Sequence, residues 1–188
     1  MKLWIVLLFL CFAKPAYCDI VVGKTDSPYE IVIFTTLTCG ACKKFYRDTM
    51  QSYLSGPYQV TIKHFAMDEK SLKGAVAVEC MPENSKYAYY KKLFKLQENL
   101  IRSENTDDFL INIAVSEFSA NAQHLRACMN KVDVKTQILQ QQSNYSEIIE
   151  ATPQFFFGKK TTPLDQRGKA SGAITSEEFE QFLKDNLQ

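Results

Sequence analysis

Cys39 and Cys42 are the residues whose type and spacing most directly suggest chemistry. They are separated by Gly40 and Ala41, in the stretch FTTLTCGACKKFY that spans residues 34–46. A Cys-x-x-Cys pair can hold a metal ion, form a structural bridge or exchange disulfides with other thiols. The elements on either side of the pair indicate which chemistry is favoured.

The pair lies where a predicted strand is followed by a predicted helix. Residues 29–37 are almost continuously apolar or β-branched, as in a strand buried on both faces, and apolar residues recur at helical spacing from Cys42 to Tyr53. Thr38 is placed to cap this helix. A thiol at a helix start lies near the positive end of the helix dipole, which stabilises its thiolate. We therefore predict that Cys39 is the attacking sulfur and that Cys42 is the inward-facing resolving partner.

A metal site and a structural bridge are the alternatives for this pair. A structural zinc site needs four ligands, and the other candidate ligands form no second close pair. These candidates are Cys80, Cys128, His64 and His124, and we expect structural or surface roles for both histidines. A bridge that closes so short a loop adds little stability. The sequence therefore favours redox exchange and predicts no metal ligands. A chaperone that holds Cu(I) between the two sulfurs is a less favoured alternative.

Residues 1–18 have the pattern of a secretory signal peptide. A basic start is followed by about a dozen apolar residues and then by a stretch of small residues, with cleavage expected near Cys18–Asp19. An uncleaved anchor and a lipidated Cys18 remain as alternatives. Export would remove Cys11 and Cys18 and leave four cysteines in an oxidising compartment, where three disulfide pairings are conceivable.

The composition is that of one globular domain with an insertion. The chain has 188 residues, of which 46% are hydrophobic and 23% are charged, and its formal net charge is +1. No basic stripe with interleaved aromatic residues is present in the sequence, so nothing indicates a nucleic-acid partner.

The order of predicted elements divides the α/β chain into three parts. Residues 19–68 give strands at 19–23, 29–37 and 59–67 around the helix of 42–53, and residues 148–188 give strands at 153–158 and 169–174 and a helix at 175–187. Between them, residues 69–147 form a block in which helical periodicity dominates. We predict that this block is a helical domain inserted into a small α/β domain. Thr175 and Glu178 have the spacing of a capping box.

An aromatic cluster lies in the helical block. It contains Tyr87, Tyr89, Tyr90 and Phe94, in a helix predicted at 85–101. The spacing favours packing in the core over a binding face.

The chain resembles the DsbA-like thiol-disulfide oxidoreductases, which have the thioredoxin fold. The resemblance lies in the strand–CxxC–helix order, the helical insertion, and Thr152-Pro153 before the apolar strand of ATPQFFF. It covers essentially the whole chain after the leader. It implies a cis peptide bond before Pro153, beside the active disulfide, and a backbone at Thr152 that pairs with the substrate chain. A proline at the start of an edge strand or in a turn is the alternative.

The resemblance also implies an activity, partners and a second disulfide. The activity is that of a protein thiol-disulfide oxidoreductase with no cofactor, acting in the periplasm on cysteine-containing exported proteins. A membrane redox partner reoxidises such an enzyme, and the expected state is a monomer. The second disulfide would join Cys80 to Cys128 in the helical block. Two buried free thiols are the alternative.

Two departures from the family pattern concern redox tuning. The Gly40-Ala41 dipeptide lacks the histidine that helps to hold the thiolate in the family, and Ile33 stands where a buried acid is common. We therefore expect a weaker oxidant than the strongest of the family. Potentials in related folds run from about −270 to about −120 mV, so the resemblance leaves the direction of exchange open. Disulfide formation in exported proteins is the favoured function, and an isomerase, a reductase or a redox-inert binding module are the alternatives.

Overall fold

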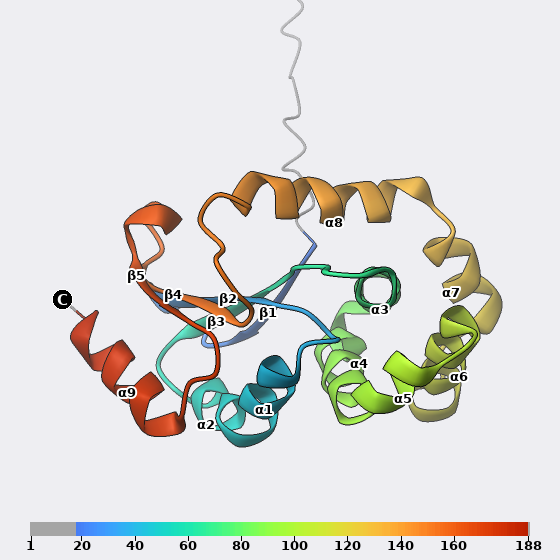
Figure 1. Cartoon of the computed structure of the whole chain (residues 1–188), viewed down its shortest axis with the longest axis horizontal. Coiled ribbons are helices and arrows are strands. Elements are labelled where there is room, and N and C mark those ends of the chain that lie inside the picture. The colour runs from blue at the N-terminus through green and yellow to red at the C-terminus, as the bar shows by residue number, and fades with distance from the viewer. Residues whose placement is uncertain (1–17, 188) are drawn as a thin grey trace, which may run out of the picture.

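The computed structural model describes residues 18–187, and the signal peptide predicted at residues 1–18 lies outside them except for Cys18. The centre of the molecule is one five-stranded sheet in the order β1-β3-β2-β4-β5 (Figure 1). Its strands are β1 (Asp19–Gly23), β2 (Tyr29–Thr35), β3 (Gln59–His64), β4 (Gln154–Lys159) and β5 (Gly168–Ser171).

The central strand, β2, is buried along most of its length because it carries continuous apolar sequence. β2 pairs with β3 in parallel and with β4 in antiparallel register, so that Ile33 lies opposite both Ile62 and Phe155. Every residue from Ile31 to Thr35 is buried. This pattern is typical of a strand with helices on both faces.

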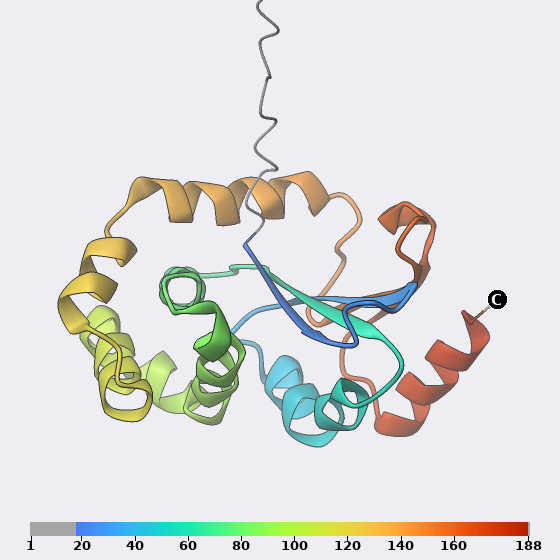
Figure 2. The same ribbon diagram turned by 180° about the vertical axis from the view of Figure 1, so that it is seen from behind.

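Helices cover both faces of the sheet. On one face lie α1 (Gly40–Asp48), α2 (Met50–Leu54) and α9 (Ser176–Asp185), while the end of α8 (Val132–Tyr145) crosses the other face (Figures 1 and 2). The first face carries an aromatic core in which the ring centroid of Phe45 lies 4.6 Å from that of Phe155 and 5.1 Å from that of Phe179. The α1 helix is thereby fixed against the centre of the sheet.

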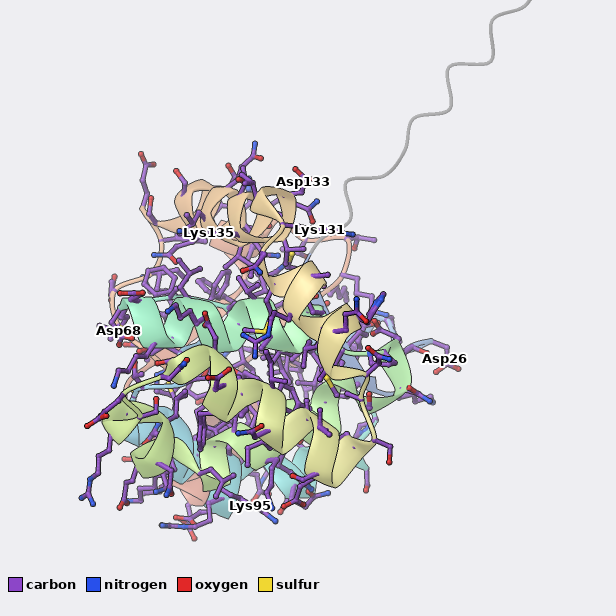
Figure 3. All side chains as sticks on the ribbon, turned by 90° about the vertical axis from the view of Figure 1, so that its right-hand side faces the viewer. Asp26, Asp68, Lys95, Lys131, Asp133 and Lys135 are labelled. Carbon is purple, nitrogen blue, oxygen red and sulfur yellow. A yellow bond between two sulfur atoms is a disulfide. The ribbon has the colours of Figure 1, made fainter. Side chains whose placement is uncertain are left out.

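A block of helices lies between β3 and β4 in the chain and beside the sheet in space. It begins with α3 (Glu69–Glu79), whose first residue follows Asp68, the residue labelled at one end of α3 in Figure 3. The block continues with α4 (Glu83–Lys95), α5 (Gln97–Arg102), α6 (Thr106–Phe118) and α7 (Ala122–Met129). α8 then leads the chain back to the sheet. None of the helices in the part of the chain that is described is long and apolar enough to span a membrane.

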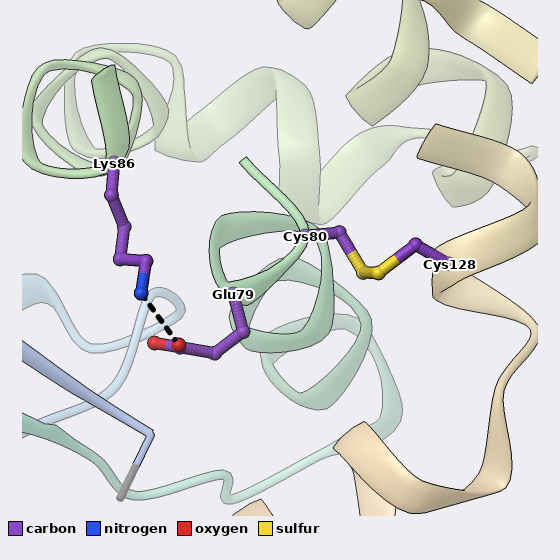
Figure 4. Close-up of a disulfide and its surroundings, with 4 residues drawn as sticks. All are labelled: Glu79, Cys80, Lys86 and Cys128. Atoms are coloured by element: carbon purple, nitrogen blue, oxygen red, sulfur yellow. Dashed lines mark hydrogen bonds and ion pairs between the residues drawn. A yellow bond between two sulfur atoms is a disulfide. The ribbon is translucent and has the colours of Figure 1, made fainter. Parts of the chain in front are cut away.

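A disulfide joins the end of α3 to α7. It links Cys80 to Cys128 with an S–S distance of 2.02 Å, and Figure 4 shows it on the side of α3 opposite to the ion pair of Glu79 with Lys86. Most of the aromatic cluster of this block is core, as expected: Tyr89, Tyr90 and Phe94 are buried, and Tyr87 is partly buried and packs against them in the core cluster.

Two predicted helices are each broken into two. The helix expected at 42–53 is interrupted at Thr49, which has φ −119° and whose hydroxyl lies 3.0 Å from that of Ser176. The helix expected at 85–101 is interrupted at Leu96, with φ −99°. Apolar periodicity continues across both breaks, which is why the sequence predicted single helices. The capping box of Thr175 and Glu178 is confirmed.

Phe155→Ala should lower the free energy of unfolding by about 3–5 kcal/mol, because it empties the centre of the aromatic core. Phe155 is 0% exposed between β2 and the rings of Phe45 and Phe179. Denaturant unfolding measures the change. The matched control is Val132→Ala, at a position 75% exposed, which should leave stability within experimental error. Equal losses in both variants would contradict this description of the core.

Candidate active site

Cys39 begins helix α1 and caps it with its own side chain. Its Sγ accepts a hydrogen bond from the backbone N–H of Cys42 at 3.3 Å, and its backbone has the extended conformation of an N-cap. The prediction that Thr38 caps this helix is wrong. Thr38 is turned toward the start of α3, where its hydroxyl donates to Asp68 at 2.6 Å. The sulfur therefore occupies the position at which backbone N–H groups meet an anion.

The pKa of Cys39 is lowered from 9.0 to about 5. The largest cause is a hydrogen bond from the Cys42 thiol, which partial burial opposes. Backbone N–H groups of Cys42 and Ala41 and the side chain of Thr152 lower the pKa further. At neutral pH the reduced Cys39 is thus a thiolate, although neither residue of the intervening dipeptide carries a polar side chain.

Cys42 has the opposite character. It is 0% exposed, and burial raises its pKa well above the ordinary value. Neither Cys39 nor Cys42 is in a disulfide, so the structure is that of the reduced pair. Cys18, the third free cysteine among residues 18–187, is buried and burial raises its pKa to about 12. Cys39 is therefore the one thiol of these three that is ionised at neutral pH.

Thr152 and Pro153 lie directly beside Cys39. The Cys39 Sγ is 3.3 Å from the carbonyl oxygen of Thr152, and the peptide bond between Thr152 and Pro153 is cis. Pro153 is buried, and its carbonyl accepts from the N–H of Gly172 at 2.8 Å. The fold thus brings together Cys39 and Thr152, which are 113 residues apart in the sequence.

A groove with a volume of about 950 Å³ opens beside Cys39. Two apolar side chains are exposed along it, Met67 at 66% and Ile101 at 42%. Its other lining residues are Thr38, Asp68, Glu69, Lys70, Glu150, Ala151 and Thr152. An extended chain can reach the sulfur through this groove. A Cβ placed on Gly40 would meet no atom within 4 Å, so nothing crowds the dipeptide.

Gln97 holds the turn before Cys39, and sequence reasoning missed it. Its buried amide nitrogen donates to the carbonyl of Leu37 at 2.8 Å and to that of Cys39 at 2.9 Å. These bonds tie the reactive turn to the helical block. A glutamine at the start of a short helix gives no distinguishing pattern in sequence.

The two histidines lie in separate environments. His64 is buried and its Nε2 lies 2.8 Å from a carboxylate oxygen of Glu79, whereas His124 is exposed. In residues 18–187 no three His, Cys, Asp or Glu side chains are gathered as a metal site would require.

The fold and the site define a class of protein. A family model described as Thioredoxin matches residues 16–185, and the chain therefore belongs to the thioredoxin family. In this α/β fold the Cys39 sulfur lies at the start of α1, beside the cis Thr152–Pro153 bond, and the helices α3–α8 are inserted between β3 and β4.

Within this class, the fold is that of the DsbA-type protein thiol-disulfide oxidoreductases. The chain is similar to Wolbachia pipientis alpha-DsbA1, with TM-score 0.79 and 20% identity over 89% of this chain and 90% of that chain. It is similar to BdbD from Bacillus subtilis (TM-score 0.75, 20% identity, 90% and 92% covered). It also resembles Pseudomonas aeruginosa DsbA2 (TM-score 0.69, 16% identity, 90% and 96% covered). A comparison with curated proteins found no match.

We expect the thiolate absorbance of the reduced protein to titrate with a midpoint near pH 5, the pKa of Cys39. Because this pKa is lowered on folding, ionised Cys39 stabilises the reduced protein fully above pH 9.0, and this stabilisation is lost as the pH falls through about 5. Cys39→Ser should abolish the transition. Cys42→Ala should raise its midpoint, since it removes the largest stabilising contact. A midpoint near 9.0 in the intact protein would show that the helix start does not hold a thiolate.

Replacing Cys80 and Cys128 together by Ser should lower the free energy of unfolding by about 2–4 kcal/mol, because the cross-link restrains a loop of 48 residues in the unfolded chain. Disulfide exchange at Cys39 should keep its rate. Denaturant unfolding and an exchange assay on the same preparation measure both quantities. A loss of exchange without a loss of stability would contradict a purely structural role.

Proposed function

We propose that this protein is an exported thiol-disulfide oxidoreductase that introduces disulfides into other proteins through the Cys39–Cys42 pair. One observation carries the proposal: the pKa of Cys39 is lowered to about 5 while Cys42 is 0% exposed. A stable thiolate favours the reduced pair over the disulfide, and this makes the disulfide a strong oxidant. Cys39 is also a good leaving group, as donation of a disulfide requires.

The reaction proceeds by two exchanges. A substrate thiolate attacks the Cys39 sulfur, the Cys39–Cys42 bond breaks, and its electron pair stays on Cys42. A second substrate thiolate then attacks the substrate sulfur of the mixed disulfide, and Cys39 leaves as a thiolate. The substrate loses two electrons and the cysteine pair gains them. Gly40 and Ala41 affect the redox potential of this exchange only because neither has a side chain that could donate a hydrogen bond to the Cys39 thiolate.

Extended substrate is held in the groove beside Cys39. The short distance of 3.3 Å between the Thr152 carbonyl and the Cys39 sulfur supports a role for the backbone before Pro153 in pairing with a peptide chain. Backbone pairing of this kind accepts many sequences, since it does not read side chains. Exposed Met67 and Ile101 add apolar contacts that are equally unselective.

The setting of the reaction follows from the first residues of the sequence. The signal-peptide pattern of residues 1–18 supports export to the periplasm, where its substrates are cysteine-containing exported proteins. A membrane partner then reoxidises the pair, and the protein acts as a monomer. The domains are the thioredoxin-like parts 19–68 and 148–188 and the inserted part 69–147.

A trapping experiment tests the proposal. Cys42→Ser should accumulate a mixed disulfide between Cys39 and a reduced, unfolded model protein, because no resolving thiol remains. Cys39→Ser should form none, since burial keeps Cys42 protonated and inaccessible. Non-reducing electrophoresis and mass spectrometry identify the adduct.

The intact protein should also oxidise the same model protein stoichiometrically when its pair is first oxidised. Reshuffling of scrambled disulfides without net oxidation would instead favour the isomerase, and no exchange with either variant would favour a binding module. Stoichiometric metal on protein purified without oxygen would favour the Cu(I) chaperone.

A further inference from the structure

Three buried hydroxyl groups beside Cys42 have no hydrogen-bond partner. In residues 18–187, four buried side-chain oxygens or nitrogens are unpaired, and three of them are the hydroxyls of Thr35, Tyr46 and Tyr90. The fourth is on Gln141. An unpaired buried polar group loses its hydrogen bonds to water on folding and gains none in return, which destabilises the folded protein. Three of them around one reactive sulfur therefore require an explanation.

The three hydroxyls form a series that starts at the Cys42 sulfur. Burial raises the pKa of Cys42, and the Thr35 side chain and the Thr36 backbone oppose that rise, so both are close to the sulfur. Burial likewise raises the pKa of Tyr90, and the hydroxyls of Thr35 and Tyr46 oppose it. The rings of Tyr46 and Tyr90 meet edge to face at 5.5 Å. Each hydroxyl lies near the next but falls short of a formed hydrogen bond.

These residues come from three different elements that enclose Cys42. Thr35 ends β2, Tyr46 lies on α1 one turn beyond Cys42, and Tyr90 lies on α4 of the inserted helices. Other titratable groups also face this cluster. They are Cys39, Tyr87 and His64. The ring centroid of His64 lies 5.6 Å from that of Tyr90, and the Nε2 atom of His64 is hydrogen-bonded to Glu79. Ile33 of β2, which is 0% exposed, belongs to the same apolar core cluster as Cys42.

Disulfide exchange places a negative charge on Cys42, at a sulfur that water does not reach. Donors that have no other partner can donate to a sulfur on which negative charge develops, and such donors stabilise the transition state. We propose that Thr35 is a catalytic residue that donates a hydrogen bond to the Cys42 sulfur as it leaves Cys39, and that Tyr90 and Tyr46 are positioning residues that polarise Thr35. This inference rests on the proposed function.

The step is balanced without a further reactant. The attacking thiolate forms a bond to the Cys39 sulfur, the Cys39–Cys42 bond breaks, and the electron pair goes to Cys42. Thr35 donates a hydrogen bond and keeps its proton. The proton that Cys42 finally carries replaces the one that the second substrate thiol loses when it attacks.

Adjacent tyrosines in α4 provide a matched test. Tyr89 and Tyr90 are both 0% exposed, but the hydroxyl of Tyr89 donates to the Leu110 carbonyl at 2.9 Å while that of Tyr90 has no partner. Tyr90→Phe should slow reduction of the Cys39–Cys42 disulfide by glutathione roughly tenfold, without lowering the unfolding midpoint. Tyr89→Phe should lower the unfolding midpoint and leave that rate unchanged.

Variants of Thr35 complete the experiment. Thr35→Val should slow the reaction about 100-fold, the lower end of the effect of losing a transition-state donor, and Thr35→Ser should retain most of the rate. The pKa of Cys39 should stay near 5 in every variant, which separates this effect from a change at the attacking sulfur. Glutathione is used because a small thiol does not depend on the groove.

The outcomes distinguish this inference from the proposed function. An oxidised wild-type protein that glutathione does not reduce would overturn the proposed function. A wild-type protein that reacts, with Tyr90→Phe and Thr35→Val reacting equally fast, would overturn only the role of the hydroxyls. Equal slowing by Tyr89→Phe and Tyr90→Phe would also overturn it, because packing alone would then explain the rate.

Discussion

The structure of the site depends on one interaction, the contact of the Cys39 sulfur with the first backbone N–H groups of α1. Those N–H groups have no partner within the helix, and a thiolate at the N-cap supplies one at 3.3 Å. The thiol of Cys42 lowers the pKa of Cys39 most, and these N–H groups lower it further, so that both favour the reduced pair. The thiolate therefore gives the free N–H groups an acceptor, and the N–H groups stabilise the thiolate. No charged side chain between the two cysteines takes part.

The rest of the molecule keeps this helix start in place. The aromatic core of Phe45, Phe155 and Phe179 fixes α1 against the sheet, and Gln97 of the inserted helices holds the preceding turn by two carbonyl groups. The segment at Thr152 completes the site from the other half of the chain. The inserted helices thus support the turn that carries Cys39, and the disulfide between Cys80 and Cys128 cross-links two of these helices.

The sequence predicted the strands, and the position of Cys39 and Cys42 at a strand–helix turn, because both leave local patterns. Continuous apolar residues in β2 and the change to helical spacing after Cys42 located the turn correctly. Two features were not predictable because they depend on distant residues. The helix breaks at Thr49, whose hydroxyl contacts that of Ser176. Cys39 caps α1 in place of Thr38, whose hydroxyl is bonded to Asp68. Gln97, Thr35 and Tyr90 left no signal for the same reason: each is a common residue whose role comes from what it faces.

We expect the helix start and the Cys42 thiol together to make the Cys39–Cys42 disulfide oxidising, and the equilibrium reduction potential of the pair against a glutathione series measures this. Mass spectrometry should follow Cys80 and Cys128 separately. The account predicts a potential well above the roughly −270 mV of thioredoxin, on the side of the scale that approaches about −120 mV. A potential near roughly −270 mV would contradict it and would assign the protein to reduction rather than to disulfide formation.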